Sequence, residues 1–207
     1  PDPEKHFEII VNKGAPLTYN GEEQRPSVEV KYYETENTGS GFSGAGVLVP
    51  EENYSVQYFN SKDANAAEGD DPYLVVTFNS GDYAGTDPVK KEFTINQADI
   101  KDVDVKWGET RSFVYNGEVQ HPTVESATYS YEVNGEKKTY TLKESDYYLV
   151  DYHGKKAGTD GVMINATHGS ANENLYMARL AGQGNFTGMI AEDVNDDDNV
   201  LFYSDLV

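Results

Sequence analysis

The chain carries one sequence pattern twice, at a spacing that matches the size of a small domain. The pattern Tyr-Asn-Gly-Glu-x-Gln-x-Pro-x-Val occupies 19–28 and recurs at 115–124, an offset of 96 residues (115 − 19). A second pattern, Gly-Asp-Tyr-Ala-Gly at 81–85, returns as Gly-Asn-Phe-Thr-Gly at 184–188. Solenoid repeats are only about 20–50 residues long, so this period indicates two copies of one domain. We therefore predict one domain over 1–97 and a second over 98–207.

Short stretches of alternating apolar residues predict β-strands in both copies. The apolar positions of 7–11 lie at every second residue, and the offset of 96 carries them onto 103–107. A β-hairpin is predicted over 129–142, because its centre is the Asn-Gly pair that tight hairpin turns prefer. No long window has the helical period of 3.6 residues. Short strands separated by turn residues predict an all-β chain made of two small β-sandwiches.

The chain is strongly acidic, which excludes several classes of partner. It has 36 Asp and Glu residues against 16 Lys and Arg, a formal net charge of −20. Because this charge repels phosphates, we expect no binding of nucleic acid or of an anionic membrane surface. No apolar run reaches the length of a membrane span, so no membrane insertion is expected, and the charge favours a monomer. The absence of Cys excludes disulfides and thiolate chemistry.

Taken together, the two repeated patterns resemble a known kind of bacterial repeat. Their order is Tyr-Asn-Gly-x-x-Gln-x-Pro-x-Val, a Tyr-containing strand, an Ala/Gly turn, and Gly-(Asn or Asp)-aromatic-(Thr or Ala)-Gly. This order is similar to that of the Ig-like tandem repeats in secreted and cell-wall-anchored proteins of Gram-positive and gut bacteria. The similarity extends over nearly all of 7–203. It implies two tandem Ig-like β-sandwich domains, an extracellular location, and a non-enzymatic role as a spacer or protein-interaction module.

Two insertions distinguish the second copy from the first, at 160–175 and at 192–199. Loops on a rigid scaffold commonly carry binding specificity. The insertions therefore support an alternative function, in which the second copy binds a glycan or a host extracellular protein, assisted by calcium.

The calcium hypothesis rests on the second insertion. Oxygen-bearing side chains stand there at every second position, at Asp193, Asn195, Asp197 and Asn199. Such spacing is typical of the first half of a calcium-binding loop. The pattern then departs from that loop, because Asp198 replaces the glycine at position six and Ser204 replaces the glutamate at position twelve. A weak Ca²⁺ site and a solvated acidic hairpin both remain open.

The remaining motifs do not predict an enzyme. The segment 39–44 matches Gly-x-Gly-x-x-Gly, but Val-Leu-Val-Pro follows soon after it and cannot open a helix, so we expect a loop. The four His residues are scattered, and neither His-Glu-x-x-His nor Gly-x-Ser-x-Gly occurs. We predict no catalytic residues.

Aromatic side chains in the second copy allow two interpretations. Tyr129, Tyr131 and Tyr140 would form either an exposed patch for glycan stacking or a set of cross-strand contacts. Trp107 aligns with Val11, which favours core packing over a sugar platform.

Overall fold

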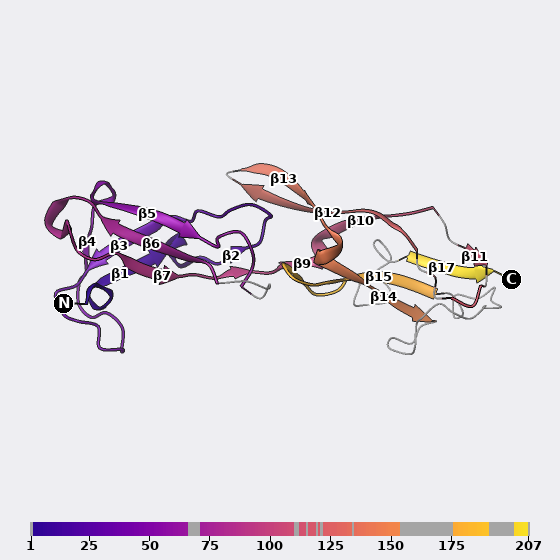
Figure 1. Ribbon diagram of the computed structural model, residues 1–207, viewed down its shortest axis with the longest axis horizontal. Helices are drawn as coiled ribbons and strands as arrows, with labels where there is room; N and C mark the ends of the chain where they lie inside the picture. Colours follow the sequence, from indigo (N-terminus) through magenta and orange to yellow (C-terminus); the bar gives the residue numbers. More distant parts are fainter. Residues whose placement is uncertain are drawn as a thin grey trace. The chain divides into compact units, whose positions relative to one another are not determined.

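The computed structural model describes residues 2–65, 71–109, 112–114, 116–118, 120, 122–133, 135–153, 176–190 and 201–206. The chain divides into two compact units, Pro1–Gln97 and Ala98–Val207, which we call unit 1 and unit 2. Both are built from β-strands (Figure 1), which confirms the all-β prediction. The helices of the described residues are three-residue 3₁₀ turns: η1 (Pro3–Lys5), η2 (Asn12–Gly14), η3 (Glu51–Asn53), η4 (Gly81–Tyr83), η5 (Ile100–Asp102) and η6 (Glu144–Asp146). Within this described part, no helix has the length and apolar character needed to cross a membrane.

The first sheet of unit 1 has three antiparallel strands in the order β1-β3-β4. These strands are β1 (Phe7–Val11), β3 (Val28–Tyr32) and β4 (Val47–Leu48). The predicted alternation places Phe7 and Ile9 of β1 in the core, and Ile9 lies opposite buried Val30 of β3. Strand β4 is a short edge strand, and both of its side chains are exposed. This edge therefore adds little to the core.

The second sheet of unit 1 packs against the first. Its strands are β5 (Tyr54–Phe59), β6 (Tyr73–Phe78) and β7 (Val89–Glu92), in that antiparallel order. The central strand buries Leu74, Val76 and Phe78. The ring of Phe7 lies against that of Phe78, with 4.3 Å between their centroids. The two sheets thus share one apolar core.

A two-stranded sheet joins the beginning of unit 1 to its end. Strand β2 (Leu17–Thr18) runs parallel to β8 (Ile95–Asn96), with Leu17 opposite Ile95. The Tyr19 N–H donates to the Asn96 carbonyl at 2.8 Å. The side chains of Tyr19 and Ile95 are both buried. Strand β2, near the start of unit 1, is therefore hydrogen-bonded directly to β8, the last strand of the unit.

The first repeated pattern forms the turn that follows β2. Gly21 has a φ of +76°, a conformation that favours glycine. Asn20 Oδ1 accepts from the Glu22 N–H at 3.0 Å, and Gln24 Nε2 donates to the Thr18 carbonyl at 3.0 Å. The same two bonds recur in unit 2, from the Glu118 N–H to Asn116 Oδ1 and from Gln120 Nε2 to the Val114 carbonyl, each 2.9 Å. The pattern is repeated because both units need the same turn.

The described residues of unit 2 form three sheets, with strand orders β10-β12-β13, β11-β17-β15-β14 and β9-β16. The strands are β9 (Ala98–Asp99), β10 (Val103–Trp107), β11 (Ser112–Val114), β12 (Val124–Val133), β13 (Glu136–Thr141), β14 (Tyr147–His153), β15 (Tyr176–Gly182), β16 (Phe186–Thr187) and β17 (Leu201–Leu206). The hairpin predicted over 129–142 is confirmed, because β12 pairs antiparallel with β13. As in unit 1, an early strand runs parallel to the last one, with Ser112 of β11 opposite Ser204 of β17.

The second repeated pattern needs its glycines for both conformation and space. Gly81 has a φ of +72°, and a Cβ there would lie 2.6 Å from the Asn53 side chain. Gly188 has a φ of +79°, and its Cβ would lie 2.8 Å from Asp99 Oδ1. Between the glycines of unit 2, the ring of Phe186 is fully buried. The pattern therefore turns the chain tightly and places an aromatic ring in the core.

Candidate functional site

The predicted calcium ligands lie outside the described residues. This holds for Asp193, Asn195, Asp197 and Asn199 and for both insertions, 160–175 and 192–199. In the described part of the chain, no group of three or more His, Cys, Asp or Glu side chains is placed to hold a metal ion.

The glycine-rich segment 39–44 is a loop, as predicted. Asn37 Oδ1 accepts from the Gly39 and Gly41 N–H groups at 2.9 and 3.1 Å, and both glycines have positive φ. Strand β4 follows the segment, so no helix N-terminus is available there to bind a phosphate.

The tyrosines predicted either to bind glycans or to pack across strands do pack. Tyr129 and Tyr140 lie opposite each other in the β12–β13 hairpin. Both rings contact Phe186, at centroid distances of 5.6 and 6.0 Å. The Tyr140 hydroxyl also donates to Asp146 Oδ2 at 2.9 Å. Tyr131 stacks on Tyr129 at 6.0 Å, so these rings cover the core of unit 2.

Trp107 is half-buried rather than fully enclosed. The pairing of β10 with β12 shifts register between Lys106 and Trp107, and Val11 at the matching position of unit 1 is likewise half-buried. Its Nε1 is buried without a hydrogen-bond partner. This position favours core packing over an exposed sugar platform.

Two tyrosines of β5 join the sheets of unit 1 along their open side. The Tyr54 hydroxyl donates to the Val28 carbonyl at 2.9 Å, and the Tyr58 hydroxyl donates to the Pro26 carbonyl at 2.5 Å. Burial raises the pKa of both hydroxyls above the usual value for tyrosine. The two bonds hold the segment before β3 beside β5 through side chains rather than through a backbone ladder.

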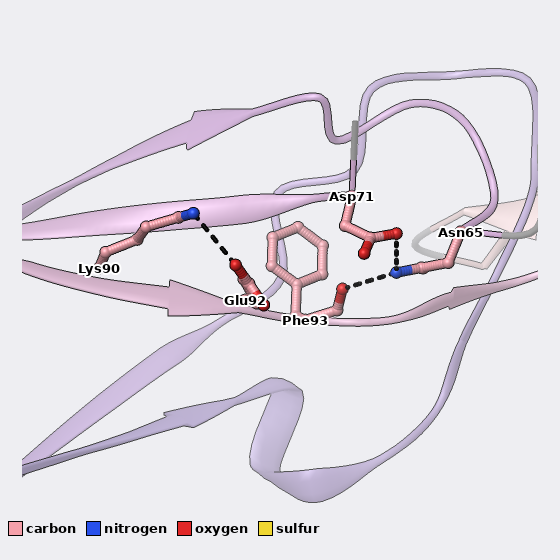
Figure 2. Close-up of polar contacts among 5 residues, drawn as sticks. All are labelled: Asn65, Asp71, Lys90, Glu92 and Phe93. Carbon is pink, nitrogen blue, oxygen red and sulfur yellow. Dashed lines mark hydrogen bonds and ion pairs between the residues drawn. The ribbon is translucent and has the colours of Figure 1, made fainter. Parts of the chain in front are cut away.

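Asn65 bonds to Ile95 of β8, and Figure 2 shows its further contacts with Asp71 and Phe93. Its Oδ1 accepts from the Ile95 N–H at 2.6 Å, and its own N–H donates to the Ile95 carbonyl at 3.1 Å. Its Nδ2 donates to Asp71 Oδ1 at 3.1 Å and to the Phe93 carbonyl at 3.4 Å. One residue, through its side-chain oxygen and its backbone N–H, thus takes the place of a strand neighbour for β8. The sequence carried no signal for this role, because Asn65 is a single polar residue in a loop.

The outward face of the second sheet of unit 1 carries a row of stacked side chains. Phe59 lies on Tyr73, with 4.8 Å between ring centroids and 11° between ring planes. Lys90 Nζ lies 4.4 Å from the centroid of Tyr73, and it also pairs with Glu92 at 3.1 Å (Figure 2). Asn60 and Tyr73 line a shallow hollow of about 500 Å³ beside this row. The row follows the strand order β5-β6-β7, so Phe59 is its outermost ring.

A second hollow lies at the free edge of β5. It measures about 340 Å³ and is lined by 56–59 of β5 together with Glu23 and Arg25, which form an ion pair at 3.5 Å. Phe59 lines it and is 38% exposed. Unit 2 has a hollow of about 490 Å³ at the corresponding edge of β14, lined by Thr123, Val124, Glu144 and 147–149. Each hollow thus lies between an edge strand, β5 or β14, and the segment that leads into a strand of the other sheet, β3 or β12.

Ionisable groups in the described residues serve packing and surface pairing. Burial is the first cause of the raised pKa of Tyr129 and Tyr147, whereas the pKa of Lys31 is raised by its hydrogen bond to Glu29. His6 stacks on Tyr32, and its Nδ1 lies 2.9 Å from the Tyr33 carbonyl oxygen. These arrangements suit binding and structural support.

Comparison with known proteins gave no relative of this chain. No protein-family model, no curated protein and no solved structure matches it.

Proposed function

We propose that the chain is a non-enzymatic pair of Ig-like β-sandwich modules from a secreted or cell-wall-attached bacterial surface protein. In this proposal the modules act as a spacer that keeps its length under tension. The repeated turn pattern, the paired sheets of unit 1 and the net charge of −20 support a soluble module used in series.

The observation that carries the proposal is the parallel pairing of an early strand with the last strand of each unit. In unit 1, β2 leads back to the start of the unit and β8 leads out of its end. A pull on both ends that is passed on through β1 therefore draws β2 and β8 in opposite directions along their common axis. Their hydrogen bonds are then loaded together, whereas an antiparallel hairpin pulled at its open end breaks one bond after another. Unit 2 has the same arrangement in β11 and β17.

Asn65 strengthens this arrangement in unit 1. Strand β8 is bonded to β2 on one side, and on the other side Ile95 is bonded to Asn65 through both its N–H and its carbonyl. The buried side chains of Tyr19 and Ile95 keep water from these bonds. Release of β8 therefore requires both sets of bonds to break, which raises the barrier to forced unfolding.

Single-molecule pulling of the whole chain by its two ends tests the proposal. We expect two separate ruptures, because each unit unfolds as a body. Unit 1 has 97 residues and releases roughly 320–350 Å of extended chain, whereas the 110 residues of unit 2 (207 − 97) release roughly 360–400 Å, before the folded lengths are subtracted. These lengths assign each rupture to its unit.

Two matched asparagine variants complete the test. Asn65→Ala is expected to lower the force of the shorter rupture and to leave the longer one unchanged. Asn37→Ala removes an asparagine that also accepts backbone hydrogen bonds, but in the 39–44 loop, and should leave both forces unchanged. Gradual extension of the unaltered chain without distinct ruptures would refute the spacer proposal.

A further inference from the structure

We propose that the hollow at the free edge of β5 in unit 1 is a binding site for a neutral pyranose sugar. This role goes beyond that of a spacer, and it does not depend on resistance to tension. The site consists of Phe59 and Gln57 on β5, together with Glu23 and Arg25 on the neighbouring segment.

The first argument is the orientation of the Phe59 ring. One of its faces is covered by Tyr73, which in turn has the Lys90 ammonium near its ring. Since β6 and β7 both lie on the same side of β5, the second face of Phe59 is directed toward the free edge of the sheet. That face is the one available to the hollow that Phe59 lines. A flat, supported aromatic face suits the apolar C–H face of a pyranose ring.

The second argument is the polar lining. Arg25 offers donors in a fixed fork, Glu23 offers acceptors, and the Gln57 amide offers both. Sugar hydroxyls need donors and acceptors at once, so this combination suits them. The ion pair of Glu23 with Arg25 has no net charge. In a chain of net charge −20, a site without local positive excess favours a neutral sugar over an acidic one.

The third argument excludes an extended peptide as the occupant. A peptide that adds to an edge strand needs a continuous row of free backbone groups. Beyond the hollow, the Gln24 N–H bonds to the Ser61 carbonyl at 2.8 Å, and Tyr58 bonds to Pro26. Asn60 has a φ of +52°, so the chain turns directly after Phe59. These contacts close the edge around the hollow and leave room for a compact ligand.

Unit 2 supplies an internal control. Its corresponding hollow also has an exposed aromatic side chain, Tyr148, which is 52% exposed. Among the described residues that line this hollow, Glu144 is the one charged side chain. We therefore place the proposed sugar site in unit 1, where the described residues supply a guanidinium, a carboxylate and an amide together.

The test is a titration of the whole chain with neutral β-linked tetrasaccharides of glucose, of N-acetylglucosamine and of galactose. Calorimetry measures affinity, and backbone amide NMR shifts locate the site. We expect at least one sugar to bind, with shifts at 23–25 and 56–59. Phe59→Ala and Arg25→Ala should each weaken binding by about tenfold or more, because they remove the stacking face and a charged donor. Phe59→Trp should retain binding, and Tyr148→Ala should not change it.

Several results would overturn the proposal. They are no binding of any of the three sugars, shifts confined to unit 2, and an affinity that Phe59→Ala leaves unchanged. Amide exchange in β6 serves as a fold check for each variant. A variant that loses both binding and this protection is replaced by Gln57→Ala, whose exposed side chain does not support the core.

Discussion

Replacement of Asn65 by alanine is expected to destabilise unit 1 selectively. The change removes the acceptor of the Ile95 N–H, and Ile95 is only 1% exposed, so water cannot replace the lost partner. An unsatisfied buried donor costs about 1–3 kcal/mol. The bond from Nδ2 to Asp71 is exposed and contributes little, because water takes its place. We therefore expect a loss of about 1–3 kcal/mol in the free energy of unfolding of unit 1.

Amide hydrogen exchange on the whole chain measures this loss without separating the units. Amides of the central strand β6 exchange through the opening of unit 1, so they should exchange roughly 5 to 150 times faster in Asn65→Ala. Amides of β12 belong to unit 2 and should be unaffected. Asn65→Asp retains an oxygen for the Ile95 N–H but loses the donor and faces Asp71, so its effect should be intermediate at neutral pH. Unchanged exchange of β6 in Asn65→Ala would show that the Ile95 bond does not stabilise the unit.

Two further predictions concern tyrosine ionisation and a repeated glycine. Burial raises the folded-state pKa of Tyr54 and Tyr58 above 10.0, so the stability that their hydroxyls provide is complete below about pH 10 and is lost as pH rises through the raised pKa. Tyr58→Phe should therefore lessen the loss of stability of unit 1 at alkaline pH. Amide exchange of β6 across this pH range measures that loss. If stability falls with pH as steeply in the variant as in the unaltered chain, Tyr58 does not have this role. Gly188→Ala should destabilise unit 2 by about 1–2 kcal/mol or more, because a left-handed conformation is combined with a clash against Asp99. Urea unfolding followed by Trp107 fluorescence measures this effect in unit 2. The control Gly85→Ala in unit 1, where a Cβ meets no neighbour, should show only the conformational cost, as measured by amide exchange of β6.

The first half of each copy could be predicted from the sequence because its signals are local. Alternation places Phe7 and Ile9 in the core of unit 1, and the same offset places Val103 and Val105 in the core of unit 2. The turn after β2 needs a glycine with positive φ, and a single residue type signals that need. Val11 and Trp107, at the matching ends of β1 and β10, are both half-buried rather than enclosed in the core.

The second halves of the two copies correspond in their contacts, although their residues are mostly not identical. Ser80 Oγ donates to the Glu52 carbonyl at 3.3 Å, and Gln183 Nε2 donates to the Glu144 carbonyl at 3.2 Å. Each residue ties the second repeated pattern to the 3₁₀ turn before the edge strand, although serine and glutamine look unrelated in sequence. The offset there is 93 residues, since η3 begins at Glu51 and η6 at Glu144.

The hollow at β5 and the Asn65 contacts could not be predicted from the sequence. Both depend on residues that are far apart along the chain, such as Arg25 with Phe59 and Asn65 with Ile95. Neither set has a periodic pattern or a fixed spacing that would identify it. The calcium loop proposed at 192–199 remains a prediction.

The parallel pairing of early and late strands also determines when each unit can finish folding during synthesis. Leu17 must wait for Ile95, which follows 78 residues later (95 − 17), and Ser112 must wait for Ser204, which follows 92 residues later (204 − 112). Contacts between such distant residues make folding slow, because a long loop must close before they form. A growing chain therefore cannot close either unit until nearly all of that unit has been made. In the proposed surface protein, export as an extended chain would leave each unit open until its last strand had followed the rest across the membrane.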